Sequence, residues 1–176
     1  SLPASQELNI RVILGPQDYE FSKQSIETFL PSAYKVTDRS NRQGLRLEGP
    51  RIESRTGSHD IVSDAVVNGS VQIPGDGKPI VLLADRQTTG GYTKIATAIS
   101  IDHPKLAQVR PGARIRFSAV SVEEAQSLFA DRTKRLTNTA LHRLAEPVLL
   151  QVDGVAISVG VVQIGSTYVA DVDGDV

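Results

Sequence analysis

The sequence of 176 residues contains no cysteine, no methionine and no tryptophan. Without cysteine, the chain forms no disulfide bond, no thiolate zinc site and no cysteine nucleophile. Because methionine is absent, the chain also does not start with one, and its first residue is Ser1. We therefore expect this chain to begin inside a longer protein.

Strong charge and long hydrophobic runs are absent too. The net charge is −1 and the pI is about 6.3, so no basic field points to nucleic acid or to an anionic membrane surface. No apolar run approaches the ~20 residues that a transmembrane helix needs. Residues 1–5 are polar, and no apolar segment of the kind found in signal peptides follows them. We therefore expect a cytoplasmic protein.

The motifs with the simplest chemical meaning are missing as well. His59, His103 and His142 have no spacing that suggests metal ligation. The turn Gly75–Lys78 resembles a phosphate loop only in its Gly-Lys pair, because a proline follows where serine or threonine is required. The acidic stretch Asp171–Asp175 lacks the sixth-position glycine and the distal glutamate of a calcium loop. The sequence therefore predicts no metal site.

Many short apolar or alternating segments are present, separated by turns rich in glycine and proline. Strands are expected over 8–14, 33–37, 45–47, 70–74, 80–84, 95–99, 113–120, 148–152, 156–164 and 167–172. Short helices are expected after Ser22 and over 102–108, where Asp102 suits a cap. The longest helix is expected over 122–144, behind a capping box that starts at Ser121, with His142 on its surface. This pattern predicts a mostly β (α+β) fold, a β-barrel with one long and one or two short helices.

The stretch Pro79–Ile99 has an unusual connection between two apolar segments. The polar run Asp85–Thr89 follows the first segment, and the pair Gly90-Gly91 lets the backbone turn or approach another group closely. A plain hairpin needs only a few turn residues, and loops held by rigid strands often carry sites. We therefore expect the candidate site in this loop, and we expect Lys94, just beyond it, at the surface.

Three segments taken together resemble one known family. They are SNRQGLRLEGP at 40–50, SDAVVNGSVQIP at 63–74, and DRQTTGGY at 85–92, the last followed by LAQVRPG at 106–112 and RIRF at 114–117. Their order and spacing are similar to those of biotin-dependent carboxyltransferase-like proteins, also labelled allophanate hydrolase subunit 2. The resemblance implies a cyclophilin-like β-barrel. We place this domain at 9–146, after a flexible lead at 1–8 and before a C-terminal β segment at 147–176, whose membership of the barrel stays open.

The family's bacterial members include a subunit of the ATP-dependent 5-oxoprolinase, which hydrolyses 5-oxoproline to glutamate. Urea carboxylase members carry an Asp-Gly-Pro-Ser-type loop before the glycine pair, whereas this chain has Gln87-Thr88-Thr89, the oxoprolinase-type pattern. The resemblance thus implies an amide (lactam) hydrolase subunit, inactive alone, which acts with A- and B-type subunits and with ATP. This chain lacks the N-terminal half that members of the family usually carry. We therefore expect it to be the C-terminal domain of a longer subunit.

Two alternatives stay open. A carboxyltransferase of the urea-amidolyase or allophanate-hydrolase type would take CO2 from carboxybiotin, and this chain has no Met-Lys pair to accept biotin itself. A non-catalytic regulatory module that binds a protein kinase is the second alternative, because some relatives of the family act in that way.

The resemblance centres the catalytic residues on the polar loop. The expected set is Asp85, Arg86, Gln87, Thr88 and Thr89. A carboxylate at the end of a buried strand is suited to act as a base or to orient the neighbouring arginine, although it also suits a turn cap. The amide and the two hydroxyls are suited to hydrogen-bond an amide substrate, or else the backbone of their own loop.

The residues expected to bind substrate flank this loop. The set is Arg42, Arg46, Gln72, Pro74, Gly90, Gly91 and Tyr92. Guanidinium groups match carboxylates and phosphates, but each arginine could instead pair with a local acid such as Glu48. Gln72 alternates with apolar neighbours and so faces solvent or a barrel mouth. The two glycine amides are suited to form an anion-binding nest, and Tyr92 either walls the pocket or packs half-buried.

Overall fold

The computed structural model describes residues 7–137, 142–143, 148–152, 155–164 and 167–173, with side-chain surroundings up to residue 135. The chain forms two compact units, Ser1–Phe129 and Ala130–Val176. The limits of the predicted domain, at 9–146, stay a prediction. Among the described helices, none combines the length and the apolar character needed to cross a membrane.

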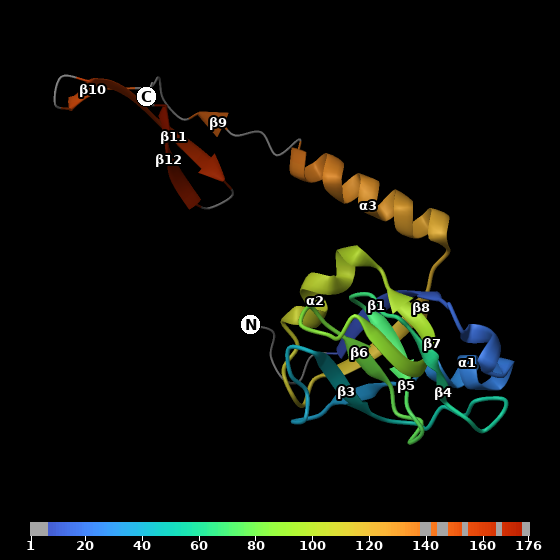
Figure 1. Ribbon diagram of the computed structural model, residues 1–176. Coiled ribbons are helices and arrows are strands. Elements are labelled where there is room, and N and C mark those ends of the chain that lie inside the picture. The colour runs from blue at the N-terminus through green and yellow to red at the C-terminus, as the bar shows by residue number, and fades with distance from the viewer. Residues whose placement is uncertain (1–6, 138–141, 144–147, 153–154, 165–166, 174–176) are drawn as a thin grey trace. The chain divides into compact units, whose positions relative to one another are not determined.

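The first unit is a closed barrel of seven strands, as the sequence pattern and the family resemblance predict (Figure 1). Around the ring the order is β1, β8, β2, β3, β6, β5 and β7, and β7 pairs with β1 to close it. An eighth strand, β4, pairs with the start of β7. The strands are β1 (Glu7–Leu14), β2 (Tyr34–Val36), β3 (Gly44–Glu48), β4 (Asp60–Ala65), β5 (Ser70–Ile73), β6 (Ile80–Leu82), β7 (Thr89–Ala98) and β8 (Arg114–Ala119).

Strand β7 begins earlier than the sequence suggests, and this changes the expected loop. The connection between β6 and β7 covers only 83–88, because Thr89 already pairs with Ala65 of β4. Gly90 and Gly91 lie inside the strand, and neither has a φ in the left-handed region. The nest of glycine amides expected from the sequence therefore does not form. Extended pairing with β4, which only the fold brings alongside, overrides the turn tendency of two consecutive glycines.

The described helices and 3-10 turns are η1 (Asp18–Glu20), α1 (Lys23–Phe29), η2 (Ser100–Asp102), α2 (His103–Ala107) and α3 (Val122–Thr137). Ser22 caps α1 as predicted, accepting a hydrogen bond at 3.1 Å from the backbone N–H of Ser25. Ser121 likewise accepts a 3.1 Å hydrogen bond from the N–H of Glu124 at the start of α3. The expected end of this helix at residue 144 is wrong, because residues 142–143 are in a strand.

The second unit is a four-stranded antiparallel sheet. Its strands are β9 (His142–Arg143), β10 (Val148–Val152), β11 (Val155–Ile164) and β12 (Thr167–Asp173). The central strand β11 pairs with each of the other three. The three strands predicted in this region are confirmed to within one residue at each end, and the turns expected between them lie outside the described residues. His142 is in β9 rather than on a helix.

Alternating apolar residues of the barrel strands fill its interior. Three rings, Phe29, Tyr34 and Phe117, form an aromatic group at one part of this core, and Phe29 stacks on Phe117 with centroids 4.6 Å apart. Burial of apolar surface, such as that of these rings, is the main favourable term in folding, and a stacked pair adds about 1 kcal/mol to it. The barrel is thus a rigid support for whatever its outer face carries.

Asp102, a buried acid at the end of η2, connects β1 with η2 and α2. The side chain of Asp102 is fully buried and accepts hydrogen bonds from Arg11, at 2.7 and 2.9 Å, and from Lys105, at 2.7 Å. Asp102 makes no helix cap with its side chain, so the cap predicted from the sequence is wrong. Burial acts to raise the pKa of Asp102, but the hydrogen bonds from Arg11 and Lys105 outweigh it and lower the pKa to about 2.

This depressed pKa predicts a loss of barrel stability in acid. The stabilisation is complete above the unfolded-state pKa of about 4, and it is lost as the pH falls through the folded-state value of about 2. We expect Asp102→Asn to lower the free energy of unfolding at pH 7 by about 3 kcal/mol, because Arg11 and Lys105 lose their partner. Chemical denaturation followed by circular dichroism at pH 2 to 7 measures both effects.

The matched control for this prediction is the exposed ion pair between Lys23 and Glu27 on α1, with a separation of 3.6 Å. Glu27→Gln is expected to change the unfolding free energy by less than about 0.5 kcal/mol. Equal losses in Asp102→Asn and Glu27→Gln, or an unchanged acid transition in Asp102→Asn, would contradict the structural role given to Asp102.

Candidate functional site

A row of side chains crosses the outer face of the barrel over three neighbouring strands. Arg46 of β3 lies opposite Ile80 of β6, and Ile80 lies opposite Gln72 of β5. Directly opposed residues of antiparallel strands project to the same face. The adjacent residues Val71 and Val81 are buried in the core, so the row projects away from it.

The row is partly covered by the beginning of β7. Gln72 is only 2% exposed, so the alternative that it faces solvent is wrong. A Cβ at Gly90 would lie 2.5 Å from the Gln72 Nε2 atom, which means that the missing side chain at Gly90 leaves space for the amide. Tyr92, two residues further along β7, borders the same space. As predicted, Gln72 projects from one face of β5, and its apolar neighbours Val71 and Ile73 project from the other face into the core.

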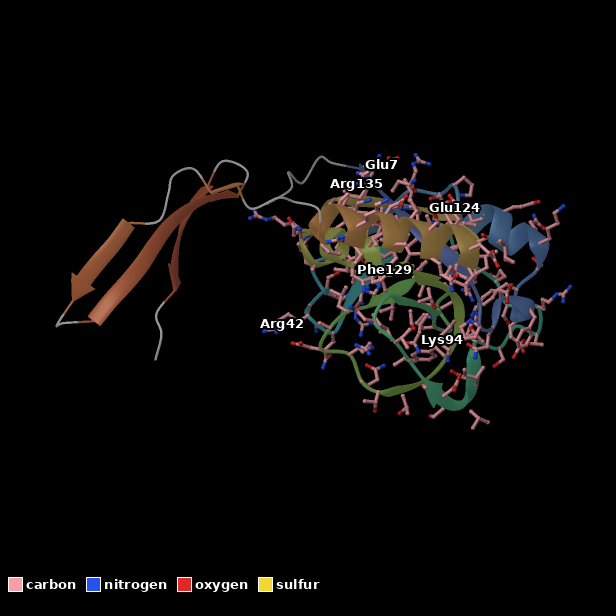
Figure 2. The ribbon with its side chains drawn as sticks, turned by 90° about the horizontal axis from the view of Figure 1, so that it is seen from above. Glu7, Arg42, Lys94, Glu124, Phe129 and Arg135 are labelled. Carbon is pink, nitrogen blue, oxygen red and sulfur yellow. The ribbon has the colours of Figure 1, made fainter. Side chains whose placement is uncertain are left out.

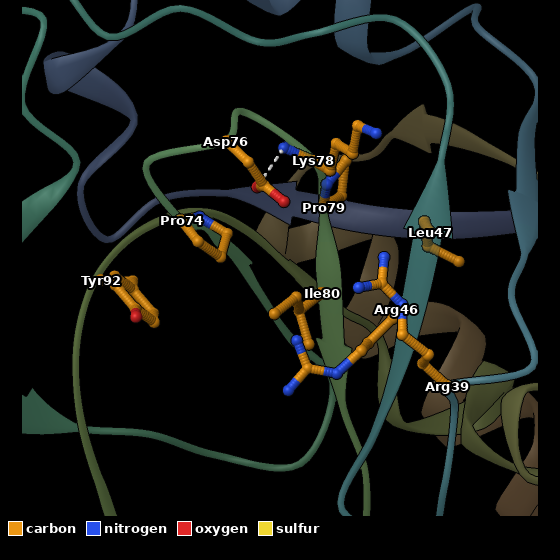
Figure 3. A pocket seen from close by; sticks show the side chains of 9 residues that line it. All are labelled: Arg39, Arg46, Leu47, Pro74, Asp76, Lys78, Pro79, Ile80 and Tyr92. Carbon is orange, nitrogen blue, oxygen red and sulfur yellow. Dashed lines mark hydrogen bonds between the residues drawn. The ribbon is translucent and has the colours of Figure 1, made fainter.

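Two adjoining cavities lie along this row. The first, here called the amide cavity, has a volume of about 120 Å³ and is lined by Asn41, Gln43, Gly44, Arg46, Gln72, Ile80, Leu82, Gln87 and Tyr92. The second, the arginine cavity, measures about 150 Å³ and is lined by Arg39, Arg46, Leu47, Pro74, Asp76, Lys78, Pro79, Ile80 and Tyr92 (Figure 3). Arg46, Ile80 and Tyr92 belong to both, so the two cavities are neighbours.

Gln72 supplies the most informative atom of the amide cavity. Its Nε2 group is buried and has no hydrogen-bond partner in the described part of the chain. Buried polar groups are normally paired, and leaving one unpaired costs about 1–3 kcal/mol. An amide N–H2 donor held at the wall of a cavity is arranged to donate to an oxygen atom of a bound molecule.

Arg46 lines both cavities with an unpaired charge. Within the described residues its guanidinium group has no ion pair or hydrogen bond, and the same holds for Arg39. The acid considered as a partner from the sequence, Glu48, instead accepts a 2.5 Å hydrogen bond from the Lys78 ammonium group. The alternative that Arg46 pairs with Glu48 is therefore wrong, and its charge is available to an anion.

Arg42 behaves differently from Arg46. Its side chain is 87% exposed and its Nε atom lies 2.9 Å from Asp85 Oδ2. It lines neither of the two cavities. Figure 2 shows it at the edge of the barrel unit. Asp85 thus orients Arg42 rather than Arg86, which donates instead to the backbone carbonyls of Val66, Leu83 and Ala84 at 3.4 to 3.5 Å. Arg86 therefore holds the connection between β6 and β7 to the segment that follows β4.

The rest of the predicted loop divides in the same way. Gln87 lines the amide cavity, and Pro74 lines the arginine cavity. Thr88 and Thr89 are exposed and line neither, and their backbones connect the loop to β4. A Cβ added at Gly91 would lie 3.6 Å from the carbonyl oxygen of Ile61, which is an ordinary van der Waals contact. The roles proposed for these residues stay predictions.

Lys94 corrects one expectation directly. It is 2% exposed, although the sequence led us to expect it at the surface (Figure 2). Its ammonium group donates to Asp64 Oδ2 at 2.8 Å, and Gln17 also donates to that oxygen at 3.2 Å. The hydrogen bond from Lys94 lowers the pKa of Asp64. This pair fixes β4 against β7 and so holds the covering segment in place.

Sequence reasoning missed several residues that line the cavities. Arg39, Asn41 and Gln43 belong to the polar turn before β3, and Lys78 follows the turn closed by a 2.8 Å bond from the Gly77 N–H to the Pro74 carbonyl. The motif SNRQG at 40–44 carried part of this signal. The local β2–β3 hairpin places Arg39 near Arg46, but nothing in the sequence separates Arg39 from other exposed arginines, because the rest of the cavity lining comes from β6 and β7.

Comparison with known proteins identifies relatives of this chain. The chain is 41% identical over 125 residues to the C subunit of 5-oxoprolinase from Escherichia coli (strain K12), covering 71% of this chain and 40% of that protein. It is 32% identical over 157 residues to urea amidolyase of Saccharomyces cerevisiae (strain S288c), covering 80% of this chain and 8% of that protein. The chain therefore spans well under half the length of these relatives.

A solved structure and a family description agree with these matches. The urea carboxylase of Kluyveromyces lactis has a TM-score of 0.72 at 23% identity, covering 93% of this chain and 16% of that one, which supports the fold. Residues 1–119 match the family described as carboxyltransferase domain, subdomain A and B. Because this match covers 119 of its 176 residues, the chain belongs to the carboxyltransferase domain family.

Proposed function

We propose that this chain is the barrel domain of a 5-oxoprolinase-type subunit, and that the paired cavities bind 5-oxoproline. The observation that carries the proposal is the unpaired Gln72 amide beside the unpaired Arg46 guanidinium, in a chain 41% identical to the C subunit of a 5-oxoprolinase. 5-Oxoproline is a cyclic amide that bears a carboxylate. One donor for the lactam oxygen and one cation for the carboxylate match those two groups.

The chemistry follows from where these groups lie. A hydrogen bond from Gln72 Nε2 to the lactam oxygen withdraws electron density from the carbonyl carbon and makes it more open to attack. Gln87 borders the same cavity and supplies a second amide. Ile80 provides an apolar floor for the methylene groups of the ring, and Tyr92 borders the bound molecule from the covering strand.

We propose that ATP binds with partner subunits of the A and B type rather than in these cavities. At about 120 and 150 Å³, the cavities are well below the ~300–1,000 Å³ of pockets for drug-sized ligands. The sequence also has no phosphate loop. The barrel domain would then hold the lactam while the partner subunits bind ATP, so that the isolated chain is inactive.

A urea-type carboxyltransferase is the second candidate. It is favoured by the extent of the match, because the yeast urea amidolyase aligns over 80% of this chain, more than the bacterial oxoprolinase protein does. Urea would use the amide cavity alone, since it carries no anion for Arg46. Carboxybiotin would have to come from a carrier elsewhere, because the chain has no methionine for a Met-Lys acceptor.

Omission of this protein from a complete reaction tests the proposal. We expect glutamate release from 5-oxoproline to require ATP, the partner subunits and the protein that contains this chain together, because each would supply a separate part of the reaction. Glutamate is measured by a coupled dehydrogenase assay. Unchanged release without the protein would overturn the proposal, and carboxylation of urea from carboxybiotin by the same mixture would favour the second candidate.

Gln72→Leu separates a binding role from a structural one. We expect it to leave the stability unchanged or to raise it by about 1 kcal/mol, because an unpaired buried amide is removed. Activity of the assembled enzyme is expected to fall at least tenfold, because the donor to the lactam oxygen is lost. The matched control is Gln24→Leu on the exposed side of α1, which should retain activity. Lower stability with full activity would show that Gln72 is structural.

Gly90→Ala tests the same amide without touching it. The added methyl group would lie 2.5 Å from Gln72 Nε2, so we expect the amide to be displaced and the KM for 5-oxoproline to rise about tenfold. Gly75→Ala is the control, because a Cβ there meets nothing within 4 Å. A crystal structure of Gly90→Ala with Gln72 in its original position, together with an unchanged KM, would contradict this prediction.

A further inference from the structure

The arginine cavity is lined by two arginines that make no ion pair within the described residues. Arg39 approaches it from the turn before β3, and Arg46 approaches it from β3 itself (Figure 3). Both side chains are exposed, and neither has an ion pair or a hydrogen bond in the described region. The positive charge of Lys78, by contrast, is already matched by Glu48 at 2.5 Å.

The comparison with Arg42 shows that this lack of pairing is not a general property of exposed arginines here. Arg42 lies three residues from Arg39 and is paired with Asp85, and Arg51 is paired with Glu53 at 2.8 Å. One carboxylate, Asp76, also borders the arginine cavity and accepts a 3.0 Å hydrogen bond from the backbone N–H of Lys78, so the lining sets two unpaired guanidinium groups against a single negative charge. Two like charges that share a small cavity attract an anion more strongly than either does alone.

We infer that the arginine cavity is a carboxylate subsite formed by Arg39 and Arg46, and that Arg39 determines specificity for anionic amides. This inference rests on the proposed function and adds to it the orientation of the substrate. The carboxylate lies between the two guanidinium groups, and the amide oxygen lies in the amide cavity against Gln72 Nε2. The ligand spans both cavities across Ile80, the residue between Arg46 and Gln72 in the cross-strand row.

This orientation has a direct chemical consequence. A molecule with a carbonyl oxygen and no anion fills only the amide cavity and loses its contacts with both arginines. An anion with no amide, such as inorganic phosphate, fills only the arginine cavity. Guanidinium groups bind a carboxylate through charged, directional hydrogen bonds, which are about twice as strong as neutral ones. The ligand class selected is therefore a small amide that carries a carboxylate.

The test is a comparison of three ligands by isothermal titration calorimetry on the complete protein that contains this chain. The ligands are 5-oxoproline, its neutral analogue 2-pyrrolidinone, and inorganic phosphate. We expect 5-oxoproline to bind at least tenfold more tightly than 2-pyrrolidinone, and phosphate to compete with 5-oxoproline. Arg39→Gln and Arg46→Gln are each expected to remove most of this difference while leaving the affinity for 2-pyrrolidinone within about twofold. Arg55→Gln, at an exposed position that lines neither cavity, is the control.

Each result points one way. Equal affinities of the wild-type protein for 5-oxoproline and 2-pyrrolidinone would overturn the inference, and so would a difference that Arg39→Gln leaves intact or that Arg55→Gln also removes. Binding of phosphate that depends on both arginines, without any such dependence for 5-oxoproline, would overturn the proposed orientation. If the affinity difference is found but the omission experiment shows no need for this protein, the proposed function fails and the carboxylate subsite stands.

Discussion

Pairing of β1 with β7 closes the sheet, and the candidate site depends on that closure. In a closed ring each strand has one face in the core, so every second residue must be apolar and the others must face outward. Val71 and Val81 point into the core, so their neighbours along the strands, Gln72 and Ile80, must point outward. The same strand β7 that closes the ring continues backward to pair with β4 and to cover the outward row. The core and the cavities therefore arise from a single register.

Much of the barrel could be predicted from local patterns. The strand segments and the N-caps at Ser22 and Ser121 follow from alternation and short-range hydrogen bonding, and both caps form as expected. The errors have a common cause in distant partners. Asp102 is not a cap because Arg11, 91 positions away, binds its carboxylate, and β7 starts at Thr89 because β4 offers an edge to pair with. A local pattern contains no information about such partners.

The candidate site was predicted in part, and the division is physical. The resemblance and the strand alternation indicated Arg46, Gln72 and Tyr92, which the fold does bring together. The order of residues along the chain suggested that Asp85 would orient its neighbour Arg86, but Asp85 pairs with Arg42, 43 positions away. The β2–β3 hairpin brings Arg39 close to Arg46, since the Thr37 N–H donates to the Arg46 carbonyl at 3.0 Å. Arg39 could nevertheless not be selected in advance, because the cavity also needs Ile80 of β6 and Tyr92 of β7. Charge pairing across strands decides which arginines are free, and a sequence does not display that pairing.

Gln72 and Lys94 differ in how their buried polar groups are paired, and this contrast supports the binding role proposed for Gln72. They lie opposite each other in the pairing of β5 with β7, and both are 2% exposed. Lys94, the more costly group to bury, has its charge matched by Asp64, and Gln17 accepts from its backbone N–H at 3.1 Å. The fold therefore does provide partners for polar groups buried on this row. Gln72 Nε2 has none among the described residues, although the gap at Gly90 preserves its space, and the open side of that space is a cavity lined by amides and an unpaired arginine. Tyr34, Thr37 and His59 also have buried side-chain atoms without a partner among the described residues, but these three residues line neither cavity, so the Gln72 amide is the one that the proposed ligand would complete.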